Sequence, residues 1–238
     1  MIYRNIFITI LGLLLTTQLS ADIYVILYAT YEGKTGHVGL AIDEYKIIVK
    51  DINKRKGLYQ YDTIKTGFLK YYDMWPKDER FKLTMASDQL AKYYSLPSYS
   101  TNNLITIKTL KEEGIPHKEH YPVDGILSKS TNLIEDLLLT AHINSVINKN
   151  KAFNAVKYNC TDFVLECLLN VTRNLVVERE RVFSFKVHTP NNLFKSLMKQ
   201  AGFYILKNPG NKIMASFFND RIIYNVIKVI ENENNKVN

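Results

Sequence analysis

The amino-acid sequence predicts a single α+β domain. β-branched and aromatic runs alternate with turn clusters, several amphipathic segments begin with helix-capping residues, and neither an internal repeat nor a long linker interrupts them. The 238 residues, 46% of them hydrophobic, provide enough apolar material for one sizeable core. We expect the domain to span residues 22–232 and to be followed by a polar tail, 233–238.

Residues 1–21 have the pattern of a secretory signal peptide. Arg4 precedes an apolar stretch from Ile6 to Leu15, and small and polar residues follow up to an expected cut after Ala21. The apolar stretch is short for a membrane span. We therefore expect a periplasmic or secreted protein with no stable membrane span after cleavage. An uncleaved N-terminal anchor is the alternative.

Runs rich in β-branched and aromatic residues predict the strands of the domain. Residues 37–42 and 45–51 flank Asp43 and Glu44, and this pattern predicts a β-hairpin with a tight turn. Residues 114–125, with two Pro and two Gly, are predicted to be a loop. The other predicted strands are residues 22–30, 57–62, 103–110 and 202–207.

Helix-capping residues predict where the helices begin. Asn132 is the expected N-cap of a helix that runs to Asn150, with Glu135 as its capping-box partner. Thr189 is the expected cap of another helix, with Pro190 at its first position. Residues 85–96 also have helical spacing.

The charge of the chain is basic but evenly patterned. The 31 Lys and Arg outnumber the 23 Asp and Glu, which gives a formal net charge of +8, yet no long basic run or nucleic-acid-binding motif is present. We therefore predict no nucleic-acid partner. A generally basic surface explains this excess, and contact with anionic surfaces is the alternative. The sequence does not indicate an oligomeric state.

The two cysteines, Cys160 and Cys167, are not expected to form a disulfide with each other. On one helix they are separated by about 10.5 Å along the axis, whereas a disulfide needs Cα atoms within about 7 Å. Cys167 lies among leucines, as a buried hydrophobic residue would. Cys160 follows the expected cap Asn159, so its thiol would lie at the positive end of the helix, where a thiolate is favoured.

A thiolate nucleophile requires an imidazole to exchange its proton. His37 is the favoured partner because it opens a predicted strand whose Gly39 and Ala41 leave space for a close neighbour. His117 and His120 form an H-x-x-H pattern, but no third ligand with metal-site spacing follows, so we predict neither a metal nor a cofactor. The other two histidines, His142 and His188, have contexts typical of packing or capping.

Two segments, "TGHVGLAID" around His37 and "YNCTDFV" around Cys160, resemble the circularly permuted papain-like fold. This is the fold of permuted NlpC-type hydrolases and of their lecithin-retinol acyltransferase relatives. The resemblance implies an antiparallel sheet packed against helices, with the nucleophile at a helix N-terminus. It also implies that Cys160 is the nucleophile and His37 the general base and acid.

The family usually has a third polar residue that orients the histidine. A hairpin with a three-residue turn would place Asp51 opposite His37, whereas a two-residue turn would place Lys50 there. We favour Asp51 because its carboxylate can accept the imidazole N–H. Tyr158 and Asn159 are candidates for the oxyanion and substrate site, although an aromatic packing role explains Tyr158 equally well. Trp75 either packs in the core or stacks on substrate.

These features predict a secreted cysteine hydrolase of amide bonds, with peptidoglycan-type peptides as its substrate class. One alternative is a lipid acyltransferase or deacylase that uses the same catalytic pair, although the acyltransferase histidine is absent near Val49. The other alternative is a non-catalytic exported binding module in which Cys160 is an ordinary buried residue.

Overall fold

The computed structural model describes residues 20–30, 36–53, 58–77, 87–96, 104–118, 121–169, 171–172, 174–182 and 185–214. Most of the predicted signal peptide, residues 1–19, and the predicted tail lie outside these residues. Ser20 and Ala21, next to the expected cleavage point, are the first residues of a strand.

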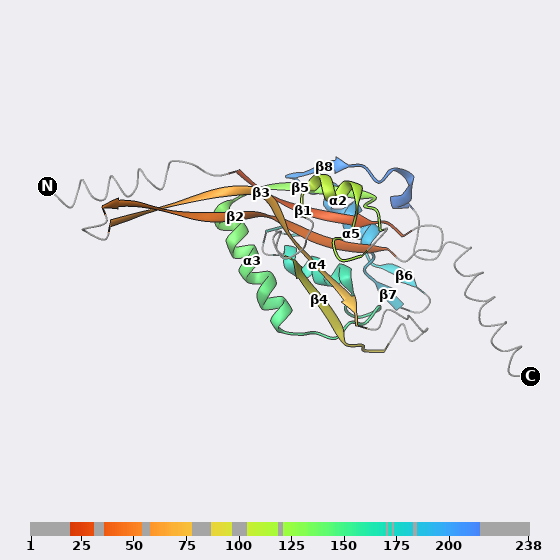
Figure 1. Ribbon diagram of the computed structural model, residues 1–238. Helices are drawn as coiled ribbons and strands as arrows, with labels where there is room; N and C mark the ends of the chain where they lie inside the picture. The colour runs from red at the N-terminus through yellow and green to blue at the C-terminus, as the bar shows by residue number, and fades with distance from the viewer. Residues whose placement is uncertain are drawn as a thin grey trace, which may run out of the picture.

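A six-stranded antiparallel sheet forms the centre of the fold (Figure 1). Its strand order is β4-β3-β2-β1-β5-β8, and β6 and β7 form a separate two-stranded sheet. The predicted α+β class is therefore confirmed. The strands are β1 (Ser20–Tyr28), β2 (His37–Asn53), β3 (Leu58–Pro76), β4 (Ala91–Leu96), β5 (Gly125–Asn132), β6 (Glu180–Val182), β7 (Phe185–Val187) and β8 (Phe203–Lys207).

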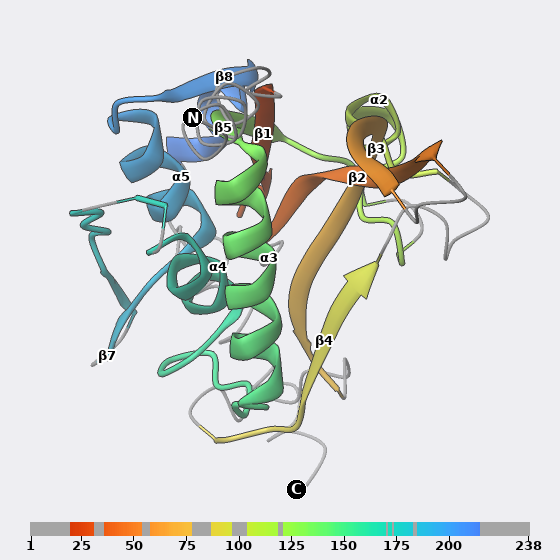
Figure 2. The same cartoon turned by 90° about the vertical axis from the view of Figure 1, so that its left-hand side faces the viewer.

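Helices cover both faces of this sheet (Figure 2). α3 (Leu133–Asn148), α4 (Cys160–Leu168) and α5 (Pro190–Met198) pack on one face, and the short α2 (Ile107–Glu112) packs on the other. A 3₁₀ helix, η2 (Gly210–Met214), follows β8. β1 divides the core because alternate side chains of a strand point to opposite faces: Val25 and Leu27 face α3–α5, whereas Tyr24 and Ile26 face α2.

The predicted helix starts are confirmed. Asn132 and Glu135 form a reciprocal capping box at the start of α3, and Asn159 caps α4. Thr189 caps α5, with Pro190 at its first position. These signals are local, so the sequence around each cap determines them without help from the rest of the fold.

The predicted hairpin at Asp43 and Glu44 is wrong. β2 runs without a turn from His37 to Asn53, and the segment near Asp43 is a register shift against β3. The chain instead reverses between Asn53 and Leu58, which pair with each other. Glu44 does not favour the positive φ that a tight hairpin turn requires, and a bulge accommodates Asp43 and Glu44 within a continuous strand.

Two further elements differ from the prediction. Residues 91–96 form β4 instead of a helix, because this segment pairs with the end of β3. Residues 107–112 form α2 instead of a strand, and a capping box of Thr106 and Thr109 starts it. The polar segment 125–132, for which no strand was predicted, is β5 and pairs with β1 in the middle of the sheet.

Gly39 allows close packing on the face of β2 that also bears His37. We expected the space beside Gly39 to admit another element, such as a helix N-terminus. It is instead filled from β3, because a Cβ at residue 39 would collide with the hydroxyl and ring of Tyr71. Gly39 therefore fixes how closely the Tyr71 ring lies against β2.

We predict that Gly39→Ala destabilises the fold by about 1–3 kcal/mol, because the added methyl group overpacks a buried site. Urea unfolding would measure the loss. In a Tyr71→Phe background the same substitution should cost less, since the hydroxyl is the closest atom to the new methyl group. An equal cost in both backgrounds would contradict this explanation.

Candidate active site

Cys160 is the first residue of α4, and Asn159 holds this helix start in place. The Asn159 Oδ1 atom accepts hydrogen bonds from the backbone N–H groups of Thr161 (2.8 Å) and Asp162 (3.3 Å). In return, the Asp162 Oδ2 atom accepts the Asn159 N–H at 3.0 Å. This reciprocal cap fixes the position of the Cys160 side chain, which lies at the positive end of the helix.

The side chain of Asn159 has no donor left for a substrate. Its Nδ2 atom donates to the carbonyl oxygens of Ala155 and His188, both at 3.1 Å. Since the N–H groups of Thr161 and Asp162 are also engaged, the Cys160 N–H is the first-turn donor for which no described residue provides an acceptor. The backbone of Cys160, and not the Asn159 side chain predicted for this role, is the available oxyanion donor.

His37 lies beside Cys160, so the structure brings together the two residues that the sequence singled out. The imidazole is buried, with 3% of the residue exposed, and its Nε2 atom lies 3.0 Å from the Asp73 Oδ2 atom. The second ring nitrogen is then the one available to the thiol. An electrostatic interaction and a side-chain hydrogen bond join His37 and Cys160.

The pKa of His37 is raised to about 9. Burial lowers this pKa, but the negative charge of Cys160 and the hydrogen bonds that the imidazole makes to Asp73 and Cys160 outweigh burial. At neutral pH the imidazolium form of His37 is therefore favoured. Because the folded pKa exceeds the ordinary 6.5, the stabilisation that His37 contributes is complete below pH 6.5 and is lost as the pH rises through about 9.

Asp73 is the carboxylate that orients His37. It is completely buried on β3. Burial raises the pKa of Asp73, but hydrogen bonds and positive charge from His117 and His37 outweigh burial and hold the pKa well below its usual range. Tyr71 and Trp75 donate further hydrogen bonds to Oδ2, at 3.2 Å and 2.8 Å. A carboxylate accepts about four hydrogen bonds, so these side chains satisfy Asp73 without water.

His117 is a second imidazole on the same carboxylate. Its Nε2 atom lies 3.0 Å from Oδ1 and 2.9 Å from Oδ2 of Asp73. The ring of Tyr94 stacks on the His117 ring with centroids 3.5 Å apart and planes 5° from parallel. No described residue provides a hydrogen-bond partner for the buried Nδ1 atom of His117. The sequence had marked this residue only as part of a weak H-x-x-H pattern, and His120, its other member, lies outside the described residues.

Trp75 covers the contact between His37 and Asp73. Its ring centroid lies 4.2 Å from that of His37, and the two planes are inclined by 30°. The Lys118 ammonium lies 3.5 Å from the centroid of the Trp75 ring. Trp75 therefore both donates a hydrogen bond to Asp73 and shields the imidazole, which is a role that neither the core nor the substrate interpretation of this residue anticipated.

Asp51, the predicted orienting residue, is not near His37. Both residues lie on β2, where Asp51 pairs with Tyr59 and His37 pairs with Tyr28. The prediction failed because it assumed a hairpin turn at Asp43 and Glu44. In the continuous strand, Lys50 does not lie opposite His37 either, since it pairs with Gln60.

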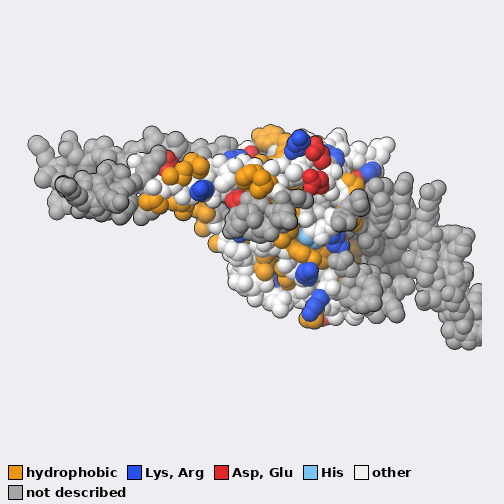
Figure 3. Space-filling model, in the orientation of Figure 1, with side chains coloured by type: hydrophobic (Ala, Val, Ile, Leu, Met, Phe, Trp, Pro, Cys, Tyr) orange, Lys and Arg blue, Asp and Glu red, His pale blue; other side chains and the backbone are white. Residues whose placement is uncertain are grey.

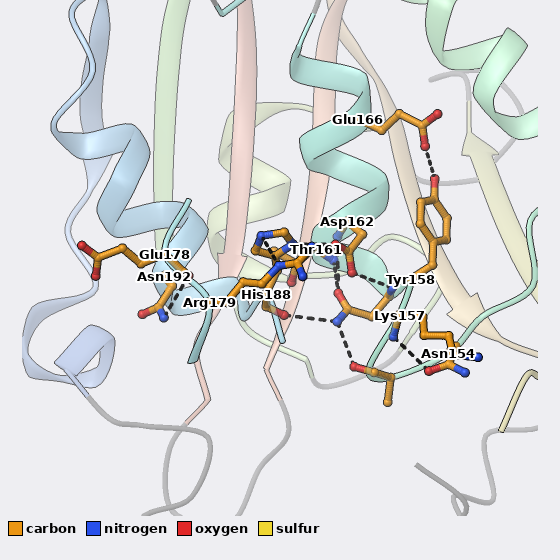
Figure 4. Close-up of polar contacts among 12 residues, drawn as sticks. Asn154, Lys157, Tyr158, Thr161, Asp162, Glu166, Glu178, Arg179, His188 and Asn192 are labelled. Atoms are coloured by element: carbon orange, nitrogen blue, oxygen red, sulfur yellow. Dashed lines mark hydrogen bonds and ion pairs between the residues drawn. The ribbon is translucent and has the colours of Figure 1, made fainter. Parts of the chain in front are cut away.

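Tyr158, the other predicted oxyanion residue, points along α4 (Figure 4). Its hydroxyl donates to the Glu166 Oε2 atom at 2.7 Å, and Lys151 binds the same carboxylate oxygen at 2.7 Å. The ring packs against the core cluster of Cys160. Tyr158 therefore has the packing role that was its alternative.

The remaining cysteine and histidines lie in other environments. Cys167 is buried, and burial raises the pKa of its thiol far above the ordinary value. Both cysteines are free. His142 donates from Nε2 to the Glu166 carbonyl oxygen, and the Nδ1 atom of His188 lies 2.6 Å from the Asp162 Oδ1 atom (Figure 4).

A groove of about 1120 Å³ lies on the α2 side of the sheet, and His117 is one of its walls. Its apolar part consists of Leu104, Ile105, Leu110, Ile115, Pro116 and Pro122, and its polar part consists of Thr109, Glu112, Glu113 and Lys118. Because His117 also binds Asp73, the groove and the Cys160–His37 pair are connected through one carboxylate.

Comparison with known proteins identifies no relative. No protein-family model matches the chain, and no curated protein or solved structure is significantly similar to it. Among the described residues, no group of three or more His, Cys, Asp or Glu is arranged to hold a metal ion. None of the described helices is long and apolar enough to cross a membrane.

We predict that Asp73→Asn slows alkylation of Cys160 by iodoacetamide at pH 7, because the amide no longer stabilises the imidazolium that accompanies the thiolate. Because the His37 pKa lies about two units above pH 7, the rate should begin to fall when this pKa drops to about 7, and should then fall about tenfold for each further unit. Peptide mass spectrometry would separate Cys160 from Cys167. Asp51→Asn is the matched control and should alkylate like the wild type. Equal rates for all three proteins would rule out Asp73 as the orienting residue.

We also predict that His117→Phe costs about 1–3 kcal/mol of stability, since Asp73 loses one buried hydrogen-bond donor. His117→Gln should cost less, because its amide can still donate to the carboxylate. Urea unfolding of the two variants would measure the difference. If phenylalanine is tolerated as well as glutamine, the hydrogen bond does not contribute to stability.

Proposed function

We propose that this protein is an exported cysteine hydrolase of amide bonds that acts on cell-wall peptides. The observation that carries the proposal is the juxtaposition of Cys160, at a helix start, with His37, whose imidazole is bound to the buried carboxylate of Asp73. This is the arrangement of nucleophile, base and orienting group that covalent catalysis requires.

The site supports a two-step reaction. The Cys160 thiolate attacks the amide carbonyl, forming a C–S bond, and the Cys160 N–H stabilises the developing oxyanion. The C–N bond breaks as the His37 imidazolium gives its proton to the leaving amine. His37 then takes a proton from water as the water oxygen attacks the thioester; the C–S bond breaks, which releases the carboxylic acid and restores the Cys160 thiolate beside the His37 imidazolium. The elevated pKa of His37 favours amides, because an amine leaves only when it is protonated.

The order of the elements supports a permuted papain-like fold for this chemistry. The histidine is at the start of β2 and precedes the cysteine, which is at the start of α4, and the sheet is antiparallel with helices packed on it. The predicted signal peptide supports a substrate outside the cytoplasm. Peptides of the cell wall are amide substrates of that compartment.

A lipid acyltransferase or deacylase is the second candidate, and the groove beside His117 favours it. The aliphatic side chains along this groove would accommodate an acyl chain. The reaction would use the same thiolate, but an alcohol or a thiol would leave in place of an amine.

We predict that Cys160→Ser and His37→Asn each abolish turnover of peptidoglycan fragments, while Cys167→Ser, which changes the cysteine in the interior of α4, retains it. Liquid chromatography of the released peptides would measure turnover. The same variants would be assayed with a fluorogenic ester and a phospholipid. Cys160-dependent hydrolysis of these lipids alone would identify the second candidate, and no Cys160-dependent turnover of any substrate would support a non-catalytic module.

A further inference from the structure

The two longest strands continue far beyond the rest of the sheet. β1 pairs with β2 only as far as Ile42, and β4 pairs with β3 only from Tyr71 onwards. Between these limits and the reversal, residues 45–53 of β2 pair solely with residues 58–65 of β3 among the described strands. We call this two-stranded segment the arm. It projects from the domain as a twisted ribbon (Figure 1).

The arm exposes aliphatic side chains. Ile47 is 66% exposed, Val49 54% and Ile64 41%. Ile47 and Val49 share one face of the ribbon because they are two residues apart, and Figure 3 shows hydrophobic side chains gathered on this projecting part. A two-stranded ribbon is only marginally stable in water by itself. Its exposed aliphatic residues therefore indicate a surface that is covered in use.

The sequence of the arm, taken together with residues 54–57 that join its two strands in the chain, is basic. Residues 45–65 contain six basic residues and two acidic ones, so this short stretch carries +4 of the formal net charge of +8. Lys46 is exposed and directly precedes Ile47. Aliphatic residues interspersed with basic residues are the composition that binds an anionic lipid interface.

We propose that the arm binds the surface of an anionic membrane, with Ile47 and Val49 between the lipid head groups and the basic residues close to the lipid phosphates. A second copy of the chain is a poorer partner, because its arm would bring the same positive charge. A nucleic acid offers phosphates but no hydrocarbon for the aliphatic side chains. The proposal is independent of the proposed catalytic function.

Polar contacts fix the root of the arm to the domain. The Lys65 Nζ atom lies 2.5 Å from the Asp43 Oδ2 atom, and the Tyr45 hydroxyl donates to the Asp136 Oδ2 atom at 3.0 Å. These contacts hold the direction of the ribbon relative to α3. His37 is at the opposite end of β2 from the arm, roughly 33 Å from Ile47 at about 3.3 Å per residue.

Vesicle flotation tests the proposal with the protein in the form obtained after export. Mass spectrometry determines the N-terminus of each variant, so that all variants are compared with the same N-terminus. The wild type should float with vesicles of phosphatidylglycerol and phosphatidylcholine but not with phosphatidylcholine alone, and raised salt should weaken binding. Lys46→Glu combined with Lys50→Glu should weaken binding at least about tenfold. The control variant combines Lys108→Glu with Lys199→Glu, two exposed positions outside the arm. It changes the net charge by the same amount as the arm variant and should leave vesicle binding nearly unchanged.

A second pair, Ile47→Thr with Val49→Thr, tests the aliphatic contribution while keeping β-branched residues in the strand. It should also weaken vesicle binding, with unchanged fluorescence from Trp75, the only tryptophan in the chain. Three results would overturn the proposal: equal losses for the arm and control charge variants, binding that survives both arm variants, or arm-dependent dimerisation in light scattering without vesicle binding.

Discussion

The buried negative charge of Asp73 is the constraint on which the candidate site depends. A carboxylate removed from water is tolerated only when donors and positive charge surround it. Here they come from three separate parts of the chain: His37 from β2, Tyr71 and Trp75 from β3, and His117 from the loop after α2. Satisfying this one side chain therefore fixes β2 against β3 and holds the His117 loop on the sheet.

The same carboxylate connects the stability of the fold to the chemistry of Cys160. By favouring the imidazolium form of His37, Asp73 favours a positive charge beside the Cys160 sulfur. The helix start of α4 acts on the sulfur from the other side through its dipole and through the Cys160 N–H. Neither part provides a nucleophile alone. A buried cysteine at a helix start lacks a base, and a buried imidazole without a nearby anion would be neutral at physiological pH.

The sequence predicted what local patterns determine. The caps Asn132, Asn159 and Thr189 and the helix-start position of Cys160 need only neighbouring residues, and all are found as expected. The orienting residue was missed because it depends on the register between two long strands. Asp73 alternates with Tyr71 and Trp75 in "YYDMWP", a period of two that places all three on one face of a strand. That period was the available signal, but only pairing with β2 shows that His37 lies on the same face.

The continuity of β2 has consequences at both of its ends. A turn at Asp43 and Glu44 would have ended the sheet there and placed Asp51 beside His37. The bulge instead lets the strand continue. His37 then binds Asp73 on β3, and the β2–β3 ribbon extends beyond the residues that pair with β1 and β4. The residues at that bulge also anchor the ribbon, since Asp43 binds Lys65 and Tyr45 binds Asp136. A single strand thus carries the proposed catalytic base at one end and the exposed arm at the other, and the distance between the two is set by backbone pairing.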